Sequence, residues 1–543
     1  MKIRLKINYL NVLWVAFYIF LLAIFLRQSF AYLDPDLGWH LKTGQQIVQN
    51  LELPRLNEIN YPLQGQKWID HEWLSNVVVY EIYTHWGYLS LTALFALIFL
   101  STFYLLNWWL KKRIFKEKFH SGLIMVLEIA GVIAIAPHLG IRIQMITTLG
   151  LLLTLIILDN YQARPKWQNL LWLIPLFYLW ASLHAGFLVG FIAVAVFWGA
   201  KMIEKFINSK VIDEKLLLAW PIIVKGMLIS LLAAATTLLT PYFLELYSFL
   251  FGYRDIFYLN HISEWLPQWA YPYIYPQFIY LSSALVLFFF YLVQKRNNLI
   301  GKINLWQLLL TLVCLVLAIK SRRNFPLFFI ASLPLIADWI RDYLKLPADF
   351  NPELSWLKKI ISLMIALALL LTAADTIAAT QFIKNPFTSF CEDKVKTSPN
   401  RHLYPCAATE FLKKQTAYQN YNLFNNFGWG GYLIWVYPQK QLFIDGRGPQ
   451  ASYRGHSILA EYYDFWNPKL IGAKLQQHDV RLILTKKRAQ PTKLSSLAKN
   501  FLLINEDEIN QNRQRDYLLD YLEMSREWKL IYQDDLSLIY VKP

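Results

Sequence analysis

Residues 9–40 read YLNVLWVAFYIFLLAIFLRQSFAYLDPDLGWH, an apolar run that ends just before an acidic segment. The apolar part, 9–26, follows a short basic stretch and approaches the length of a membrane-spanning helix. The residues after it, 27–30, lack the small-residue cleavage pattern of a signal peptide. The stretch therefore predicts an uncleaved first span whose N-terminus is cytoplasmic.

The composition of the whole chain agrees with a membrane protein. Hydrophobic residues make up 56% of the 543 residues and aromatic residues 16%, which is too much for a water-soluble chain of this length. The formal net charge of +16 comes mostly from Lys and Arg in short stretches between apolar runs, as positive-inside topology explains. No nucleic-acid-binding module is recognisable, so nucleic acid is not an expected partner.

Apolar runs along the chain predict about eleven spans. They lie near residues 9–26, 89–110, 121–136, 143–158, 170–183, 186–200, 216–239, 277–293, 304–319, 325–340 and 360–379. Several are shorter than the ~20 residues of a straight span, so the number of crossings carries a margin of about two. We expect an α-helical polytopic membrane protein, with a transmembrane domain over 1–380 and a small soluble α/β domain over 381–543.

The charges of the loops predict the orientation in the membrane. If the spans alternate in direction, the positive-inside rule assigns these basic segments to the cytoplasm: 111–118, 201–210, 295–296 and 341–359. The acidic loop 32–87 and the soluble domain then lie on the exocytoplasmic side of a plasma or inner membrane. Cys391 and Cys406 both fall on that oxidising side, so they predict a disulfide.

The soluble domain combines strand and helix patterns. Residues 442–447, 480–485 and 537–541 have the composition of β-strands, and residues 409–414 and 494–502 have that of helices. These patterns predict a small α/β fold.

The first candidates for chemistry are Asp34 and Asp36. Pro35 between them favours an extended or turn conformation, which lets both carboxylates approach one centre. Such a pair could act as a general base, or bind a divalent cation such as Mg²⁺ or Mn²⁺ that steadies a phosphate leaving group. The alternative is structural, because one of these acids could only cap a helix or a turn.

Further polar residues are expected at the same membrane face. Acids and histidines in the loops could line a substrate cavity: His40, His71, Glu72, His184 and Glu264. Cations at span ends could hold a donor phosphate, since Arg binds phosphate oxygens in bidentate fashion: His138, Arg142, Arg322 and Arg323. For the two neighbouring arginines the alternatives are that they extend to lipid headgroups, or that one short span is miscounted.

This layout resembles the GT-C superfamily of integral membrane glycosyltransferases, which includes oligosaccharyltransferases and protein mannosyltransferases. The shared features are a first span, an Asp-x-Asp in a large exocytoplasmic loop, many further spans and a C-terminal soluble domain. The resemblance implies a sugar donor linked to polyprenyl phosphate or pyrophosphate. It also implies that Asp36 or Asp34 is the catalytic acid of the loop and that Arg322 and Arg323 contact the donor phosphate.

A second resemblance lies in the soluble domain. Residues 426–434, NFGWGGYLI, and the following FIDGR at 443–447 look like the tryptophan-rich motif and aspartate of oligosaccharyltransferase catalytic subunits. In those enzymes the region helps to bind the acceptor peptide. Gly430 stands where that motif has an aspartate. Trp429 and Tyr432 could stack on sugar faces, or they could simply pack in a small core.

These features together predict a glycosyltransferase. It would move a sugar from a polyprenyl-phosphate carrier to an acceptor on the exocytoplasmic face, with inversion by single displacement. The acceptor class stays open between glycan, lipid and protein. No P-loop or dinucleotide fingerprint is present, so no nucleotide cofactor is expected. The alternatives are a transporter or flippase of lipid-linked sugars and a non-catalytic membrane assembly protein.

Overall fold

The computed structural model describes residues 9–112, 121–206, 218–252, 255–270, 275–294, 304–343, 356–391, 404–488, 493–494, 496–500, 505–507 and 516–543. The chain divides into two units. The first, here called the helical unit, comprises Met1–Ala31, Thr92–Pro241 and Pro267–Phe382. The second, the mixed unit, comprises Tyr32–Leu91, Tyr242–Leu266 and Ile383–Pro543. The sequence-based boundary near residue 380 is close to the one between Phe382 and Ile383, but the acidic loop groups with the C-terminal residues.

Each of the predicted apolar runs is a helix in the described part of the chain. These helices are α1 (Tyr9–Ala31), α3 (Trp73–Leu110), α4 (Ser121–Ile135), α5 (Gln144–Ala163), α6 (Leu173–Leu183), α7 (Phe187–Phe206), α8 (Trp220–Ala235), α11 (Tyr275–Gln294), α12 (Leu305–Lys320), α13 (Phe325–Tyr343) and α14 (Trp356–Ala378). Among the described residues, six helices are long and apolar enough to cross a membrane by length and composition, in α1, α3, α5, α7, α8 and α14. The number of crossings beyond these stays a prediction.

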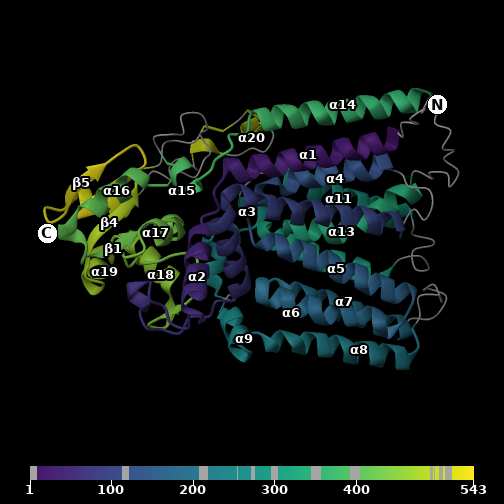
Figure 1. Ribbon diagram of the computed structural model, residues 1–543, viewed down its shortest axis with the longest axis horizontal. Helices are drawn as coiled ribbons and strands as arrows, with labels where there is room; N and C mark the ends of the chain where they lie inside the picture. Colours follow the sequence, from purple (N-terminus) through teal and green to yellow (C-terminus); the bar gives the residue numbers. More distant parts are fainter. Residues whose placement is uncertain are drawn as a thin grey trace. The chain divides into compact units, whose positions relative to one another are not determined.

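The helices of the helical unit run side by side, as Figure 1 shows for α1, α4, α5 and α7. The outer pair is α1 and α14, which pack along their length. Lys359 near the start of α14 lies over the ring of Tyr9 at the start of α1, with its ammonium 5.7 Å from the ring centroid. At the other end, Phe30 packs on Phe382 with ring centroids 5.0 Å apart. The two helices are therefore parallel, as an odd number of alternating spans between them requires.

Helix α3 begins earlier than the apolar pattern predicts. It starts at Trp73 rather than near residue 89, so the last part of the predicted loop is helical. The two parts meet at Gly87, whose φ of 78° lies in the left-handed region that glycine adopts without a Cβ clash. Because the part before the kink at Gly87 has mixed composition and the part after it is apolar, hydropathy could show only the second part.

The sheet of the mixed unit has four strands in the order β1-β4-β6-β5. They are β1 (Asn422–Asn425), β4 (Val480–Lys486), β5 (Lys529–Gln533) and β6 (Ser537–Val541). β1 pairs with β4 in parallel, and the other neighbours are antiparallel. The strands expected at 480–485 and 537–541 are therefore confirmed. The helix expected at 409–414 is part of α16 (Cys406–Lys414), and the one expected at 494–502 overlaps α20 (Ser496–Asn500) and extends beyond the described residues.

Short helices and a small hairpin complete the mixed unit. They are α2 (Leu37–Asn50), α9 (Leu244–Phe251), α10 (Ile256–His261), α15 (Pro386–Ser389), α17 (Gly430–Val436), α18 (Ile458–Tyr463), α19 (Ile471–Gln477), α22 (Tyr517–Met524), β2 (Ser452–Tyr453) and β3 (His456–Ser457). An aromatic core lies beneath β1, where Phe424 stacks on Phe465 with ring centroids 4.2 Å apart.

The strand expected at 442–447 is wrong. Leu442 makes isolated bridges to Asn60 and Leu423, but the segment forms no ladder. The side chain of Asn425 substitutes for a neighbouring strand: its Oδ1 accepts from the N–H of Phe443 at 2.9 Å, and its Nδ2 donates to the carbonyl of Ile444 at 2.9 Å. A side-chain amide satisfies the backbone here, which strand composition cannot reveal.

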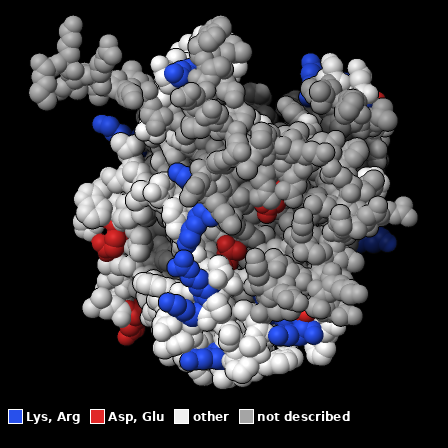
Figure 2. All heavy atoms as spheres, turned by 90° about the vertical axis from the view of Figure 1, so that its right-hand side faces the viewer, with Lys and Arg blue, Asp and Glu red and all other residues white. Residues whose placement is uncertain are grey.

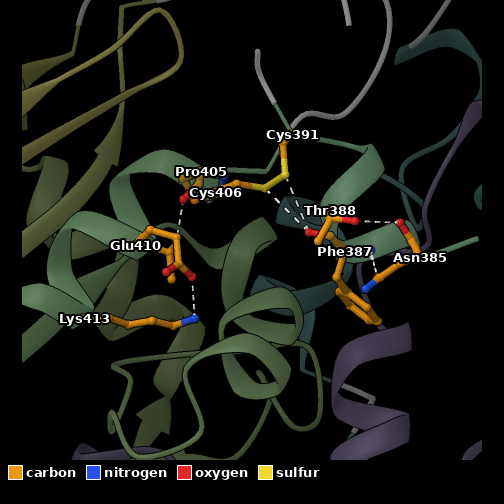
Figure 3. Close-up of a disulfide and its surroundings, with 9 residues drawn as sticks. Asn385, Phe387, Thr388, Cys391, Pro405, Cys406, Glu410 and Lys413 are labelled. Atoms are coloured by element: carbon orange, nitrogen blue, oxygen red, sulfur yellow. Dashed lines mark hydrogen bonds and ion pairs between the residues drawn. A yellow bond between two sulfur atoms is a disulfide. The ribbon is translucent and has the colours of Figure 1, made fainter. Parts of the chain in front are cut away.

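A disulfide lies near the start of the C-terminal part of the mixed unit, which begins at Ile383. Cys391 and Cys406 are bonded, with Cα atoms 5.4 Å apart, which is the separation that such a bridge requires. Figure 3 shows the bridge above Phe387, whose carbonyl faces both sulfur atoms. The geometry is therefore that of the predicted disulfide.

Removing this bridge should destabilise the mixed unit. Cys391→Ser with Cys406→Ser opens a loop with a sequence separation of 15, and the chain-entropy argument gives a loss of ~3 kcal/mol. We expect a lower midpoint in thermal unfolding of the purified full chain. Cys314→Ser serves as the control, because Cys314 is a buried free cysteine. Two free thiols at 391 and 406 in the intact mass of unreduced protein would contradict the prediction.

Candidate functional site

The two acids of the Asp-x-Asp motif have different local roles. Asp34 Oδ1 accepts a hydrogen bond from the backbone N–H of Asp36 at 2.9 Å, which makes Asp34 a turn-forming residue. Asp36 is the N-cap residue of α2, yet its side chain makes no capping hydrogen bond. Its carbonyl accepts from the N–H groups of Trp39 and His40 at 3.1 Å. The structural alternative thus describes Asp34, whereas the half-buried carboxylate of Asp36 is not used as a cap.

Glycines bring three chain segments into contact around Asp36. A Cβ on Gly38 of α2 would overlap the carbonyl oxygen of Gly431 of α17, and a Cβ on Gly431 would overlap the carbonyl oxygen of Pro35. A Cβ on Gly446 would overlap Asp36 Oδ1. The Asp36 carboxylate therefore lies directly over the backbone of Gly446, and only glycine leaves room for it.

A buried ion pair holds the segment next to Gly446. Arg447 donates from Nε and Nη2 to the two carboxylate oxygens of Asp445 at 3.0 and 2.9 Å. Asn60 donates to Asp445 Oδ2 at 2.9 Å and accepts from Arg447 at 3.0 Å. The guanidinium also lies 4.9 Å from the ring centroid of Trp68. Because both carboxylate oxygens of Asp445 accept from Arg447, this pair keeps the backbone under Asp36 in one position.

A second polar cluster begins one turn after Asp36. His40 Nδ1 lies 2.6 Å from Asn76 Oδ1, and Asn76 Nδ2 donates to both oxygens of Asp70 at 2.8 and 2.9 Å. His40 Nε2 lies 3.8 Å from Glu72 Oε2, and His71 Nε2 lies 3.6 Å from Glu72 Oε1. The predicted cavity residues of the first loop are therefore brought together, with Glu72 between the two imidazoles.

Burial shifts the titration of two members of this cluster. Desolvation lowers the pKa of His40 to about 3, so the imidazole is neutral at physiological pH. Desolvation also raises the pKa of Asp70 to about 6, although its hydrogen bond from Asn76 acts in the opposite direction. At pH 7 the cluster thus contains neutral His40 beside ionised Asp70.

Trp429 and Tyr432 are not open platforms for a sugar. They are only 2% and 4% exposed, and Tyr432 stacks on Tyr404 with ring centroids 4.9 Å apart. Both rings pack in a core in this structure, and a role of Trp429 and Tyr432 in a substrate cavity stays a prediction. Gly430 has a packing role too, because a Cβ there would lie 2.6 Å from Asp445 Cβ and 2.8 Å from the carbonyl oxygen of Ile444. An aspartate would not fit at this position.

Glu264 lies in the turn after α10 and is half-buried. Trp265 beside it donates to the hydroxyl of Tyr258 at 2.9 Å. The stretch from Tyr242 to Leu266, which includes α9 and Glu264, contacts the first loop: Phe249 of α9 packs on the ring of His71 with centroids 5.1 Å apart. The role of Glu264 in a substrate cavity stays a proposal.

The expected phosphate-binding residues lie in the helical unit, around the start of α11. Gln277 of α11 donates to His138 Nε2 at 2.9 Å. One turn later, Tyr280 packs on Phe325, the residue after the corner that contains Arg322 and Arg323, with ring centroids 5.6 Å apart. Both arginines are half-buried. The two corners therefore approach the same end of α11.

Arg142 and His184 belong to the neighbouring corners of the helical unit. Arg142 is buried just before α5. Thr147, in the first turn of α5, lies 2.6 Å from His184 Nδ1, which also accepts from the N–H of Gly186 at 2.9 Å. His184 ends α6, so the α4–α5 and α6–α7 connections are joined by these contacts.

An apolar groove of about 510 Å³ lies between α7 and α12. Its lining is entirely apolar: Val196, Gly199, Ala200, Ile203, Leu309, Leu312, Val313, Val316 and Leu317. A Cβ on Gly199 would meet nothing within 4 Å, so this position opens the groove. Leu317 lies only one turn before Lys320, at the end of α12 that leads into the arginine corner.

A compact group of possible cation ligands lies elsewhere in the mixed unit. Among the described residues, His456, Glu461 and Asp464 are such a group, with ligand atoms within 4.8 Å of one another. Lys474 already places its ammonium there, 2.7 Å from Glu461 and 3.0 Å from Asp464. This ammonium occupies the position of a cation. Asp34 and Asp36 do not form such a three-ligand group within the residues that the structure describes.

The comparisons bear on the fold. No protein-family model matches the sequence, and no curated protein matches it. Among solved structures, a match is the crystal structure of the Archaeoglobus fulgidus oligosaccharyltransferase tethered through a disulfide bond to an acceptor peptide containing the NVT sequon. The TM-score is 0.51 at 11% identity, over 98% of this chain and 74% of that one. This chain has an oligosaccharyltransferase-like fold. The likeness to oligosaccharyltransferases expected from the sequence is thereby confirmed at the level of fold.

Sequence reasoning missed two residues of the site. Asn60 and Asn76 are both fully buried and each makes hydrogen bonds to a buried aspartate. A signal existed for Asn76, because it follows Glu72 by one helical turn and its N–H donates to the carbonyl of Glu72 at 2.9 Å. No local signal existed for Asn60, whose partners come from the far end of the chain.

Proposed function

We propose that this protein is a membrane glycosyltransferase that moves a sugar from a polyprenyl-phosphate-linked donor to an acceptor, with inversion. The observation that carries the proposal is the half-buried Asp36 carboxylate, which no cap uses and which a glycine accommodates, within an oligosaccharyltransferase-like fold. A carboxylate held in this way is suited to act as a general base.

The reaction is a single displacement at the anomeric carbon. The nucleophilic atom of the acceptor gives its proton to Asp36 and forms the new bond to the anomeric carbon. The bond between that carbon and the phosphate oxygen breaks, and its electron pair leaves with the phosphate. Arg322 and Arg323, with His138 and Arg142, would stabilise the phosphate charge. A divalent cation bound near Asp36 would add to that neutralisation.

The polyprenyl part of the donor is assigned to the groove between α7 and α12. Its apolar lining suits an isoprenoid chain, and α12 continues from the groove to Arg322 and Arg323. An isoprenoid chain bound in this groove would therefore have its phosphate end near Arg322 and Arg323.

The proposed topology places the N-terminus in the cytoplasm and the mixed unit outside. Figure 2 shows Lys and Arg side chains running across the face of the helical unit at the start of α1. Lys359 belongs to this end, as its contact with Tyr9 shows. The prediction is that a periplasmic-type reporter fused after residue 450 is active and a cytoplasmic one is silent. A fusion at Lys112 is the matched control with the opposite pattern, and cytoplasmic activity at residue 450 would contradict the topology.

Sugar transfer is tested in reconstituted vesicles with a radiolabelled polyprenyl-phosphate-linked sugar and a membrane extract as the source of acceptors. We expect label to move from the donor into the acceptor fraction. If the donor crosses the bilayer without transfer, the protein is a transporter. If neither occurs over a range of donor sugars, an assembly role replaces the enzymatic one.

A further inference from the structure

The hydrogen bonds around His40 determine which ring nitrogen carries its proton. Asp70 is fully buried, and both of its oxygens lie within hydrogen-bonding distance of one terminal atom of Asn76, at 2.8 and 2.9 Å. A carboxylate only accepts, so the atom facing it is the amide nitrogen. The amide oxygen of Asn76 must then face His40, at 2.6 Å from Nδ1. An amide oxygen also only accepts, so Nδ1 carries the hydrogen.

The other ring nitrogen, Nε2, therefore presents a lone pair. It makes no hydrogen bond among the residues that the structure describes, although His40 is only 7% exposed. It points toward Glu72, whose Oε2 lies 3.8 Å away, and Glu72 is itself only 7% exposed. His71 Nε2 lies 3.6 Å from the other carboxylate oxygen of Glu72, so an imidazole lone pair, a carboxylate and a second imidazole meet here, and these are atoms that a divalent cation binds.

This arrangement has the form of a prepared metal ligand. Histidines that bind metals are neutral, and their other N–H is donated to a carbonyl or carboxylate that fixes the tautomer. Here the Asn76 carbonyl takes that proton, and Asp70 fixes Asn76. Asp36, the acid that the sequence assigns to a cation, lies one turn before His40 on α2.

We propose that His40 Nε2 and the Glu72 carboxylate bind the divalent cation of the site, with Asn76 as the residue that positions His40. The proposal rests on the proposed function for the role of the cation, but not for its binding. An imidazole among carboxylate ligands favours Mn²⁺ and Zn²⁺ over Mg²⁺. The protein should therefore bind Mn²⁺ more tightly than Mg²⁺.

The test is Mn²⁺ binding to the purified full chain in nanodiscs, without donor or acceptor. Loss of the free Mn²⁺ signal in electron paramagnetic resonance gives the affinity, and pulsed measurements detect nitrogen coupled to the bound ion. With ¹⁵N-labelled histidine, we expect the coupling to ¹⁴N to be replaced by a coupling to ¹⁵N. His40→Asn should abolish it, because Asn can keep the donor toward Asn76 but has no atom at the Nε2 position.

Three further variants make the result specific. His40→Gln places an amide oxygen near the Nε2 position, so Mn²⁺ should still bind but without coupled nitrogen. Asn76→Ala should weaken Mn²⁺ binding by ~10- to 100-fold, as loss of a positioning partner does at other metal sites. His456→Asn is the matched control, because His456 belongs to the other histidine-containing cluster.

Nitrogen coupling that survives in His40→Asn and disappears in His456→Asn would overturn the proposal. So would the absence of Mn²⁺ binding to a folded protein with its disulfide intact. Because no sugar transfer is measured, a failure of the proposed function would leave these readouts unchanged, and the two failures are distinguishable.

Discussion

Asp36→Asn is expected to lower sugar transfer by ~10²-fold or more while the protein still inserts and folds. Asparagine keeps the size of the side chain but removes the charge that accepts the acceptor's proton. Because the Asp36 side chain does not cap helix α2, the exchange removes no cap from that helix. The measurement is initial transfer rate from a radiolabelled polyprenyl-phosphate donor in vesicles, at saturating donor.

Two variants separate charge from position. Asp34→Asn keeps an oxygen that can accept from the N–H of Asp36, so it should reduce transfer much less than Asp36→Asn. Gly446→Ala keeps the charge but adds a Cβ that overlaps Asp36 Oδ1, so it should impair transfer by displacing the carboxylate. The intact disulfide and the thermal midpoint report folding of each variant. Wild-type transfer by the Asp34→Asn, Asp36→Asn double variant would eliminate the acid-loop mechanism.

Arg322→Ala is expected to weaken use of the phosphate-linked donor by about 2 to 5 kcal/mol, which is ~30- to ~4000-fold in kcat/KM. Arg322 is half-buried at the corner between α12 and α13, where its charge is only partly screened by water. Its loss would leave the phosphate with one fewer bidentate partner. The effect should appear in KM for the donor, with a smaller effect on kcat if the contact also stabilises the leaving group.

The controls use the same corner of the helical unit. Arg322→Lys keeps the charge but loses the planar pair of donors, so its kcat/KM for the donor should lie between those of the wild type and Arg322→Ala. Lys320→Ala removes an exposed cation at the end of α12 and should change donor use little. Equal effects of Lys320→Ala and Arg322→Ala would indicate general attraction to an anionic surface, and unchanged donor KM in Arg322→Ala would contradict the assignment.

Much of the helical unit could be predicted because long apolar runs have few alternatives. Each apolar run predicts a helix that is present. A helix start is misplaced only where the hydropathy signal changes within one element, as in α3. The corner cations were found from charge alone, since Arg322 and Arg323 stand out between two apolar helices. Their common approach to α11, through Tyr280 and Gln277, was not predictable, because helix neighbours are chosen by packing.

The mixed unit shows where local patterns fail. The strand expected at 442–447 is wrong because the Asn425 side chain satisfies the backbone there. The sequence could not decide whether Trp429 is buried, because an aromatic residue has the same local signature on a sugar platform and in a core; the fold leaves it 2% exposed.

The sequence by itself determined that this chain is a membrane protein with an acidic first loop, because apolar length and charge are local properties. It also singled out Asp36 as a candidate for chemistry. Only the tertiary structure decided which backbone segments lie against each other. Gly38 meets Gly431, and Asp36 lies over Gly446, across most of the chain. The tautomer of His40 was decided in the same way, since it depends on Asn76 and through it on the Asp70 side chain, which the fold places against the Asn76 amide.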